Sequence, residues 1–194
     1  LREPGRTMVP AVLANPILQA DGWAMLKRVV ILAALVSIFA TGAAMAQSSK
    51  PTLVQKFNDW EVYSYDGQSG KICYALSKPK DMQPSDRDHG DVFFFVSNRP
   101  SEGVKGETSM LVGYTFKENS SVTVDIDGQK FTLFTKGDGA WMENPAQEAS
   151  LLSAMRAGRA MSASGASSRG TETSYRFSLS GVTAASDKVN QLCN

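Results

Sequence analysis

Apolar and polar residues alternate with a period of two along most of the chain beyond residue 60, and this pattern predicts β-strands. Residues 60–65 and 71–77 alternate in this way on either side of a turn, so they predict a hairpin. Residues 91–97 instead hold a continuous apolar run, which is typical of a central strand covered on both faces. The same signals predict further strands at residues 107–116, 122–126, 130–134, 139–142, 161–168 and 173–179.

Two segments carry helical signals instead. Asn144 suits an N-cap and Pro145 the first turn of a helix that would end at Gly158, with an apolar stripe that includes Leu151. A second short helix is expected at residues 184–193. We therefore expect about eight strands and two short α-helices, spaced as in a mainly β, antiparallel β-sandwich of the immunoglobulin-like kind.

The N-terminal region has the form of a secretory signal peptide at residues 25–46. A short basic segment begins at Met25, twelve mostly apolar residues follow, and the segment ends in Ala44-Met45-Ala46, an A-x-A cleavage motif. We expect cleavage between Ala46 and Gln47, and no membrane span afterwards, because a span needs roughly 20 apolar residues. Residues 1–24 show no periodicity and are expected to be an upstream extension that is not native. Residues 47–194 would then form a single domain, and we expect its core to include Trp60, Phe94 and Trp141, which are large apolar residues within predicted strands.

Composition excludes several classes of protein. The formal net charge is +1, so no basic footprint for nucleic acid is present. One His and two Cys leave too few ligands for a structural zinc site. In the oxidising compartment that a signal peptide implies, two cysteines suffice for one disulfide, and we expect Cys73 and Cys193 to form it. A reactive thiol is the alternative, but Cys193 is next to the last residue and no base lies near either cysteine in sequence.

Few segments of the chain resemble a metal-binding, catalytic or phosphate-binding motif. The acidic cluster at residues 86–91 departs from a calcium-loop pattern and reads as a solvated loop. His89 has no nucleophile motif to serve as a general base. Residues 165–171 resemble a phosphate-binding loop in composition only and predict a turn between strands. We therefore expect no catalytic residues, no metal and no cofactor.

A family resemblance is carried by segments spread along the chain: residues 59–63, 71–79, 96–100, 112–114, 140–141, 152–158, 168–171 and 175–181, followed by Cys193. Together they resemble the invasion-associated locus B family of secreted bacterial proteins. The resemblance covers nearly all of residues 47–194 in order, and no single motif bears it. Many members carry another cysteine shortly after the first tryptophan motif, where this chain has Tyr63 to Tyr65. The family-motif residues in these segments are Trp60, Arg99, Trp141, Arg169 and Gly170.

The resemblance implies a β-sandwich that is periplasmic, secreted or associated with the outer membrane, with no catalytic residues to carry over. We expect a non-enzymatic protein that binds an unidentified protein or envelope component. An envelope-modifying hydrolase or lyase stays open as an alternative and would need titratable groups that converge in a pocket. A host-cell adhesion or invasion factor is a further alternative, taken from the family name.

Overall fold

The computed structural model describes residues 50–194, which belong to one compact unit. The predicted signal peptide, the predicted cleavage point between Ala46 and Gln47 and the predicted upstream extension lie outside the described residues. The described part is mainly β, with two short α-helices, α2 (Glu148–Ala157) and α3 (Val182–Leu192), as expected from the sequence. Its strands are β1 (Thr52–Phe57), β2 (Trp60–Gly67), β3 (Gly70–Ser77), β4 (Asp81–Gln83), β5 (Phe93–Arg99), β6 (Val104–Leu111), β7 (Ser121–Ile126), β8 (Gln129–Lys136), β9 (Gly139–Met142), β10 (Ala160–Ala166) and β11 (Glu172–Ser178).

Each of the predicted strands is present, although the segment at 107–116 is shifted to β6 and ends at Leu111. The hairpin between β7 and β8 turns at Asp127 and Gly128, which both have positive φ (52° and 88°). That conformation is the type I′ turn that an Asp-Gly pair favours. Two strands, β1 and β4, were not predicted, because every residue of β4 and nearly all of β1 are exposed and their sequences carry no burial pattern.

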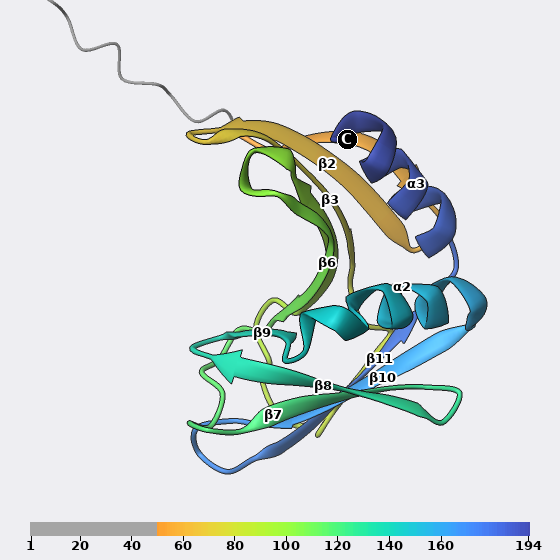
Figure 1. The fold of residues 1–194 in the computed structure, drawn as a ribbon. Coiled ribbons are helices and arrows are strands. Elements are labelled where there is room, and N and C mark those ends of the chain that lie inside the picture. The colour runs from red at the N-terminus through yellow and green to blue at the C-terminus, as the bar shows by residue number, and fades with distance from the viewer. Residues whose placement is uncertain (1–49) are drawn as a thin grey trace, which may run out of the picture. The chain divides into compact units, whose positions relative to one another are not determined.

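All strands in residues 50–194 pair antiparallel in one sheet, in the order β1-β2-β3-β5-β6-β9-β8-β7-β10-β11-β4. Only residues 78–80 separate β3 from β4, so a short link joins the β2–β5 region to the far edge of the sheet. Figure 1 shows β2, β3 and β6 bowed, with α3 on the outer side of the bow, and β7, β8, β10 and β11 forming a second part.

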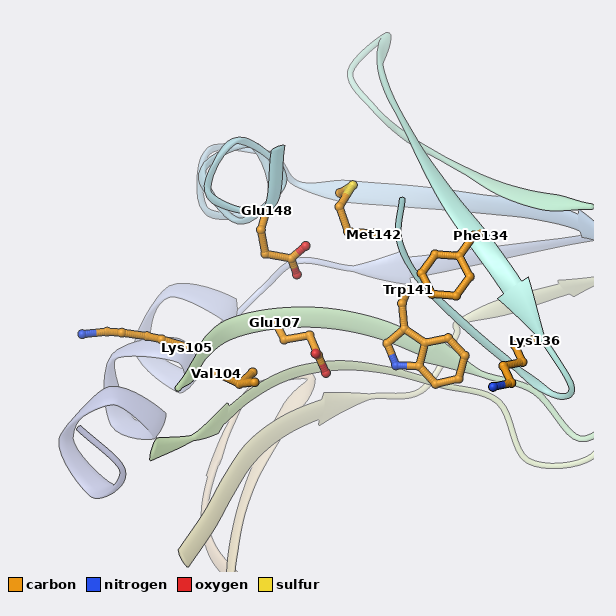
Figure 2. A pocket seen from close by; sticks show the side chains of 8 residues that line it. All are labelled: Val104, Lys105, Glu107, Phe134, Lys136, Trp141, Met142 and Glu148. Carbon is orange, nitrogen blue, oxygen red and sulfur yellow. The ribbon is translucent and has the colours of Figure 1, made fainter. Parts of the chain in front are cut away.

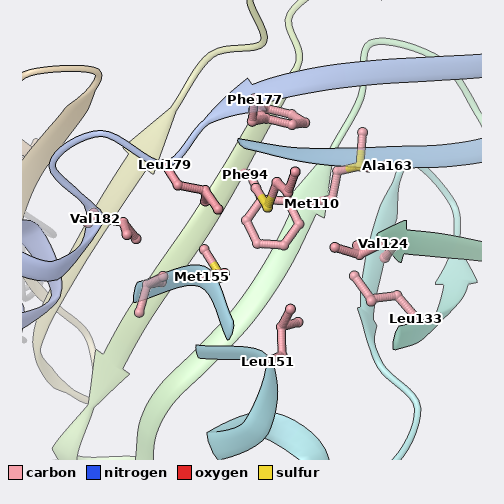
Figure 3. Packing of buried hydrophobic residues seen from close by; sticks show 14 of the residues in the cluster. Phe94, Met110, Val124, Leu133, Leu151, Met155, Ala163, Phe177, Leu179 and Val182 are labelled. Atoms are coloured by element: carbon pink, nitrogen blue, oxygen red, sulfur yellow. The ribbon is translucent and has the colours of Figure 1, made fainter. Parts of the chain in front are cut away.

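The core lies where these two parts of the sheet pack against each other. The rings of Phe94 in β5 and Phe177 in β11 lie 5.7 Å apart, and both side chains are fully buried. Leu151 and Met155 of α2 complete this cluster (Figure 3). Trp60 is also buried, as predicted, and its Nε1 donates to the Ser178 carbonyl oxygen at 3.1 Å. This packing is compatible with a sandwich, and the immunoglobulin-like arrangement stays a prediction.

The predicted disulfide between Cys73 and Cys193 is confirmed: the two Cα atoms lie 5.8 Å apart and both side chains are buried. It joins β3 to the residue that follows α3. Beside it, the buried Asn98 donates from Nδ2 to the Cys193 carbonyl oxygen and to Asn190 Oδ1, and its Oδ1 accepts from the Gly106 N–H. The C-terminal helix is therefore fixed to the sheet by one covalent bond and by an amide whose polar atoms are all hydrogen-bonded.

Candidate functional site

The five residues that carry the resemblance do not share one place in the structure. Trp60 belongs to the core, and Arg169 and Gly170 lie at the turn between β10 and β11. Arg99 in β5 and Trp141 in β9 line the same hollow, although they are far apart in sequence. This hollow is the strongest candidate for a functional site.

Arg99 and Trp141 lie on the side of the sheet that faces away from α3. The residues of β2 and β3 that point toward the helix, such as Trp60, Val62, Cys73 and Ala75, are buried, and alternate residues point the other way. We call six of the aromatic side chains on this opposite side the aromatic face: Tyr63, Tyr65, Tyr74, Phe95, Phe134 and Trp141.

The rings of the aromatic face form two groups. Tyr74 stacks on Tyr63 at 5.5 Å between ring centroids and meets Phe95 edge to face at 5.8 Å. Trp141 and Phe134 form a tilted pair at 5.8 Å. Ser109 separates the groups, because it pairs with Phe95 on one side and with Trp141 on the other. Phe134 is 43% exposed and the other rings are half-buried, so the face remains open to a ligand.

A planar ion pair lies between the two aromatic groups. Arg99 donates from Nη1 and Nη2 to the two carboxylate oxygens of Glu107, each at 2.9 Å, and from Nε to Glu102 at 2.7 Å. These charge-assisted hydrogen bonds, chiefly those to Glu107, raise the pKa of Arg99 despite its partial burial. The guanidinium is therefore held in one orientation at the floor of the face.

Two hollows meet at Glu107 and Trp141. The larger has a volume of about 680 Å³ and opens where β9 diverges from β6, with Phe134 and Met142 among its walls. Figure 2 shows Glu107 and Glu148 projecting into the same space as Trp141. The smaller, of about 260 Å³, lies over Tyr74, Phe95 and the ion pair. The larger volume falls within the range of small-ligand sites.

Glu148 lies at the start of α2 and closes one wall of the larger hollow. Its side chain accepts the backbone N–H of Thr108, beyond the last residue at which β9 pairs with β6. Burial raises the pKa of Glu148, the nearby Glu107 carboxylate adds to this rise, and the hydrogen bonds from Thr108 oppose it.

The indole of Trp141 lies over Gly139, two residues earlier on the same face of β9. A Cβ at position 139 would overlap the six-membered ring of the indole. Glycine at this position therefore allows the indole to lie flat along its own strand instead of projecting from it. The sequence contains this signal, since Gly139 and Trp141 are two apart in a predicted strand.

A third hollow, of about 440 Å³, lies apart from these two and is lined by Arg169, His89 and Tyr114. His89 is buried, with Nδ1 at 2.8 Å from the Tyr175 hydroxyl and Nε2 at 3.0 Å from the Pro84 carbonyl oxygen. Both ring nitrogens are hydrogen-bonded to other groups of the protein, so neither is free to take a proton from a substrate. The turn predicted at residues 165–171 is present between β10 and β11, with Gly170 at φ 80°.

Two expectations about side-chain position are wrong. Trp141 was expected in the core with Trp60 and Phe94, but it lines both hollows of the face. The apolar run in β5 was expected to be covered on both faces, yet only Phe94 and Val96 are buried, whereas Phe93 and Phe95 are half-buried. In both cases hydrophobicity alone indicates burial, whereas the packing of the helices and of the second part of the sheet decides which face of a strand is covered.

Sequence reasoning missed the other members of the site: Glu107, Phe134, Gly139 and Glu148. They come from β6, β8, β9 and α2, and strand register brings them together.

Within residues 50–194, no helix is long and apolar enough to cross a membrane. The same residues hold no group of three or more His, Cys, Asp or Glu arranged to bind a metal ion.

Comparison with known proteins gives one finding. No curated protein and no solved structure matches the chain. The family model described as "Invasion associated locus B (IalB) protein" matches residues 60–190, which is more than half of the chain. The matched range includes the whole aromatic face, the Arg99–Glu107 ion pair and Glu148. The chain therefore belongs to the invasion associated locus B family.

Proposed function

We propose that this chain is a non-enzymatic protein of the periplasm or cell surface that binds a protein or envelope component through the aromatic face. The observation that carries the proposal is the pair Phe134 and Trp141, whose rings stay exposed or half-exposed beside the 680 Å³ hollow. Aromatic side chains left open beside a concavity are typical of binding sites.

The polar groups of the site favour binding over catalysis. Both oxygens of Glu107 accept hydrogen bonds from Arg99, and Glu148 accepts the N–H of Thr108. A general acid or base must exchange its proton with a substrate, whereas these carboxylates hold neighbouring groups in place. Their positions suit a rigid site that recognises shape.

The proposed compartment has three supports. The sequence carries the signal peptide pattern at residues 25–46, and a disulfide links Cys73 to Cys193. Disulfides persist in oxidising compartments such as the periplasm. The third support is the family, which the resemblance describes as secreted bacterial proteins.

One observation favours a second candidate, an envelope-modifying hydrolase or lyase. Glu107 and Glu148 project into the same hollow, and the pKa of Glu148 is raised, as a general acid requires. This candidate requires that wild-type protein release soluble fragments from isolated envelopes and that Glu148→Gln abolish the release. Host-cell adhesion has only the family name in its favour.

Sedimentation with isolated bacterial envelopes tests the proposal. We expect wild-type protein to sediment with the envelopes, and Phe134→Ala and Trp141→Ala each to weaken retention by about tenfold or more, as for central aromatic contacts. Leu53→Ala in β1 is the matched control, because Leu53 is 50% exposed, similar to Phe134 at 43%. Unaltered retention of both aromatic variants, or no sedimentation of wild type, would overturn the proposal.

A further inference from the structure

We infer that the occupant of the aromatic face is an extended glycan chain of neutral pyranose sugars that lies across the strands from Tyr63 to Phe134. This inference rests on the proposed function and names its ligand class. Three properties of the face point to this ligand: the direction of the aromatic row, the polar groups in the middle of the row, and the presence of charges of both signs along it.

The row crosses the strands instead of following one of them. Its rings come from β2, β3, β5, β9 and β8, which are neighbours in the sheet except that β6 contributes Ser109 in the middle. Five inter-strand steps give the row a length of roughly 24 Å. An extended, equatorially linked sugar chain advances by a similar step for each sugar, so successive sugars would meet successive strands.

The middle of the row suits hydroxyl groups. Between the two aromatic groups lie Ser97, Ser109 and the Arg99–Glu107 pair, which line the smaller hollow together with Tyr74 and Trp141. A pyranose presents an apolar C–H face and a rim of hydroxyls. The aromatic rings at either end match the apolar face, and the hydroxyls and carboxylate in the middle match the rim.

Charges of both signs lie on the face. Arg99 is paired with Glu107 and Glu102, and Lys136 and Glu148 add one charge of each sign to the larger hollow. Lys105 also lines this hollow, but its amine points away from it and donates to Asn194 Oδ1 at 3.2 Å (Figure 2). A strongly acidic or basic ligand would meet charge of its own sign as often as the opposite sign. A neutral ligand fits this surface better than a charged polymer.

A polypeptide strand is a weaker fit. Extended peptides bind sheets along an unpaired edge, where backbone N–H and C=O groups are open. β2, β3 and β5 are paired with neighbours on both sides over most of their length. β6 pairs with β9 only from Ser109 to Leu111, but two N–H groups of its remaining segment are already occupied, that of Gly106 by Asn98 Oδ1 and that of Thr108 by Glu148. A peptide strand would therefore find few free backbone donors beside the row.

Calorimetric titration of the intact protein with chitohexaose, an extended neutral chain, tests the inference. We expect binding that Trp141→Ala and Phe134→Ala each weaken by about tenfold or more, while Leu53→Ala leaves it unchanged. Maltohexaose, a neutral chain that coils, should bind at least tenfold more weakly. Circular dichroism of each variant checks that it is folded.

Absence of chitohexaose binding, or binding that Trp141→Ala does not weaken, would overturn the glycan assignment. Equal binding of maltohexaose would overturn the assignment of an extended chain. If envelopes still retain the protein through Trp141 while chitohexaose fails, the proposed function stands and the glycan inference falls. If both tests fail, the two fall together.

Discussion

The orientation of Trp141 depends on the residue two positions before it. Gly139 leaves the space that the indole occupies, and an alanine methyl group there would overlap the ring. We expect Gly139→Ala to displace the indole and to weaken retention on envelopes about as much as Trp141→Ala does. Displacing a well-packed ring typically costs about 1–3 kcal/mol, so the variant should still fold. A shift in tryptophan emission, with Leu53→Ala as the unshifted control, reports the displacement; unchanged emission and retention would contradict it.

The raised pKa of Glu148 makes the stability of the fold depend on pH. Because its folded-state pKa is raised, chiefly by burial, the folded chain binds this proton more tightly than the unfolded chain does. Stability from this group is therefore lost as the pH rises from the unfolded pKa through the folded pKa.

Glu148→Gln removes this titration and keeps an oxygen that can accept the Thr108 N–H. We expect the urea midpoint of Glu148→Gln to rise relative to wild type as the pH rises above the ordinary pKa of a glutamate. Glu143→Gln, an exposed change nearby, should show no such trend. A relative midpoint that falls as the pH rises would contradict the assigned direction of the pKa.

At the scale of elements, the disulfide and Asn98 hold α3 to the sheet. The helix buries few side chains of its own, with Val182, Ala185, Ser186 and Val189 facing inward. The double variant Cys73→Ser/Cys193→Ser should lose at most about 5 kcal/mol of stability by the loop-entropy relation for 120 residues of separation. Amide exchange should rise in α3 before it rises in β5 and β6. Equal acceleration in helix and sheet would contradict this order.

Most elements could be predicted from the sequence because one face of each is buried. Alternation located β2 and β3, Asp127-Gly128 located the β7–β8 hairpin, and Asn144-Pro145 located the start of the α2 region. By contrast, β1 is ordered by pairing with β2 and buries almost nothing, so its sequence carries no such signal. The disulfide could be predicted because the chain has only two cysteines.

The candidate site was harder to predict from the sequence, for a physical reason. Trp141, Phe95 and Tyr74 look like core residues, since hydrophobicity does not say which face of a strand a helix will cover. Their meeting with Arg99 and Glu107 depends on the register of β3, β5, β6 and β9. Register joins residues more than 60 positions apart, and no local pattern encodes that distance.

At the scale of the whole described unit, stability should depend on the contact between the two parts of the sheet. Phe94 and its neighbour Phe95 provide a matched pair, because Phe94 packs on Phe177 and Phe95 lies on the aromatic face. We expect Phe94→Ala to cost about 3–5 kcal/mol and Phe95→Ala clearly less, from urea midpoints. Equal costs would mean that the aromatic face is part of the core and not an open surface.

Radical footprinting of the protein bound to isolated envelopes tests most directly whether the aromatic face is the binding surface. Side-chain oxidation is read residue by residue in the free and the bound protein. We expect bound protein to show strong protection at Trp141 and Phe134, and unchanged oxidation at Leu53 and Met82, which are exposed at the edge strands β1 and β4. Protection at Leu53 or Met82, with Trp141 as reactive as in free protein, would contradict the proposed site.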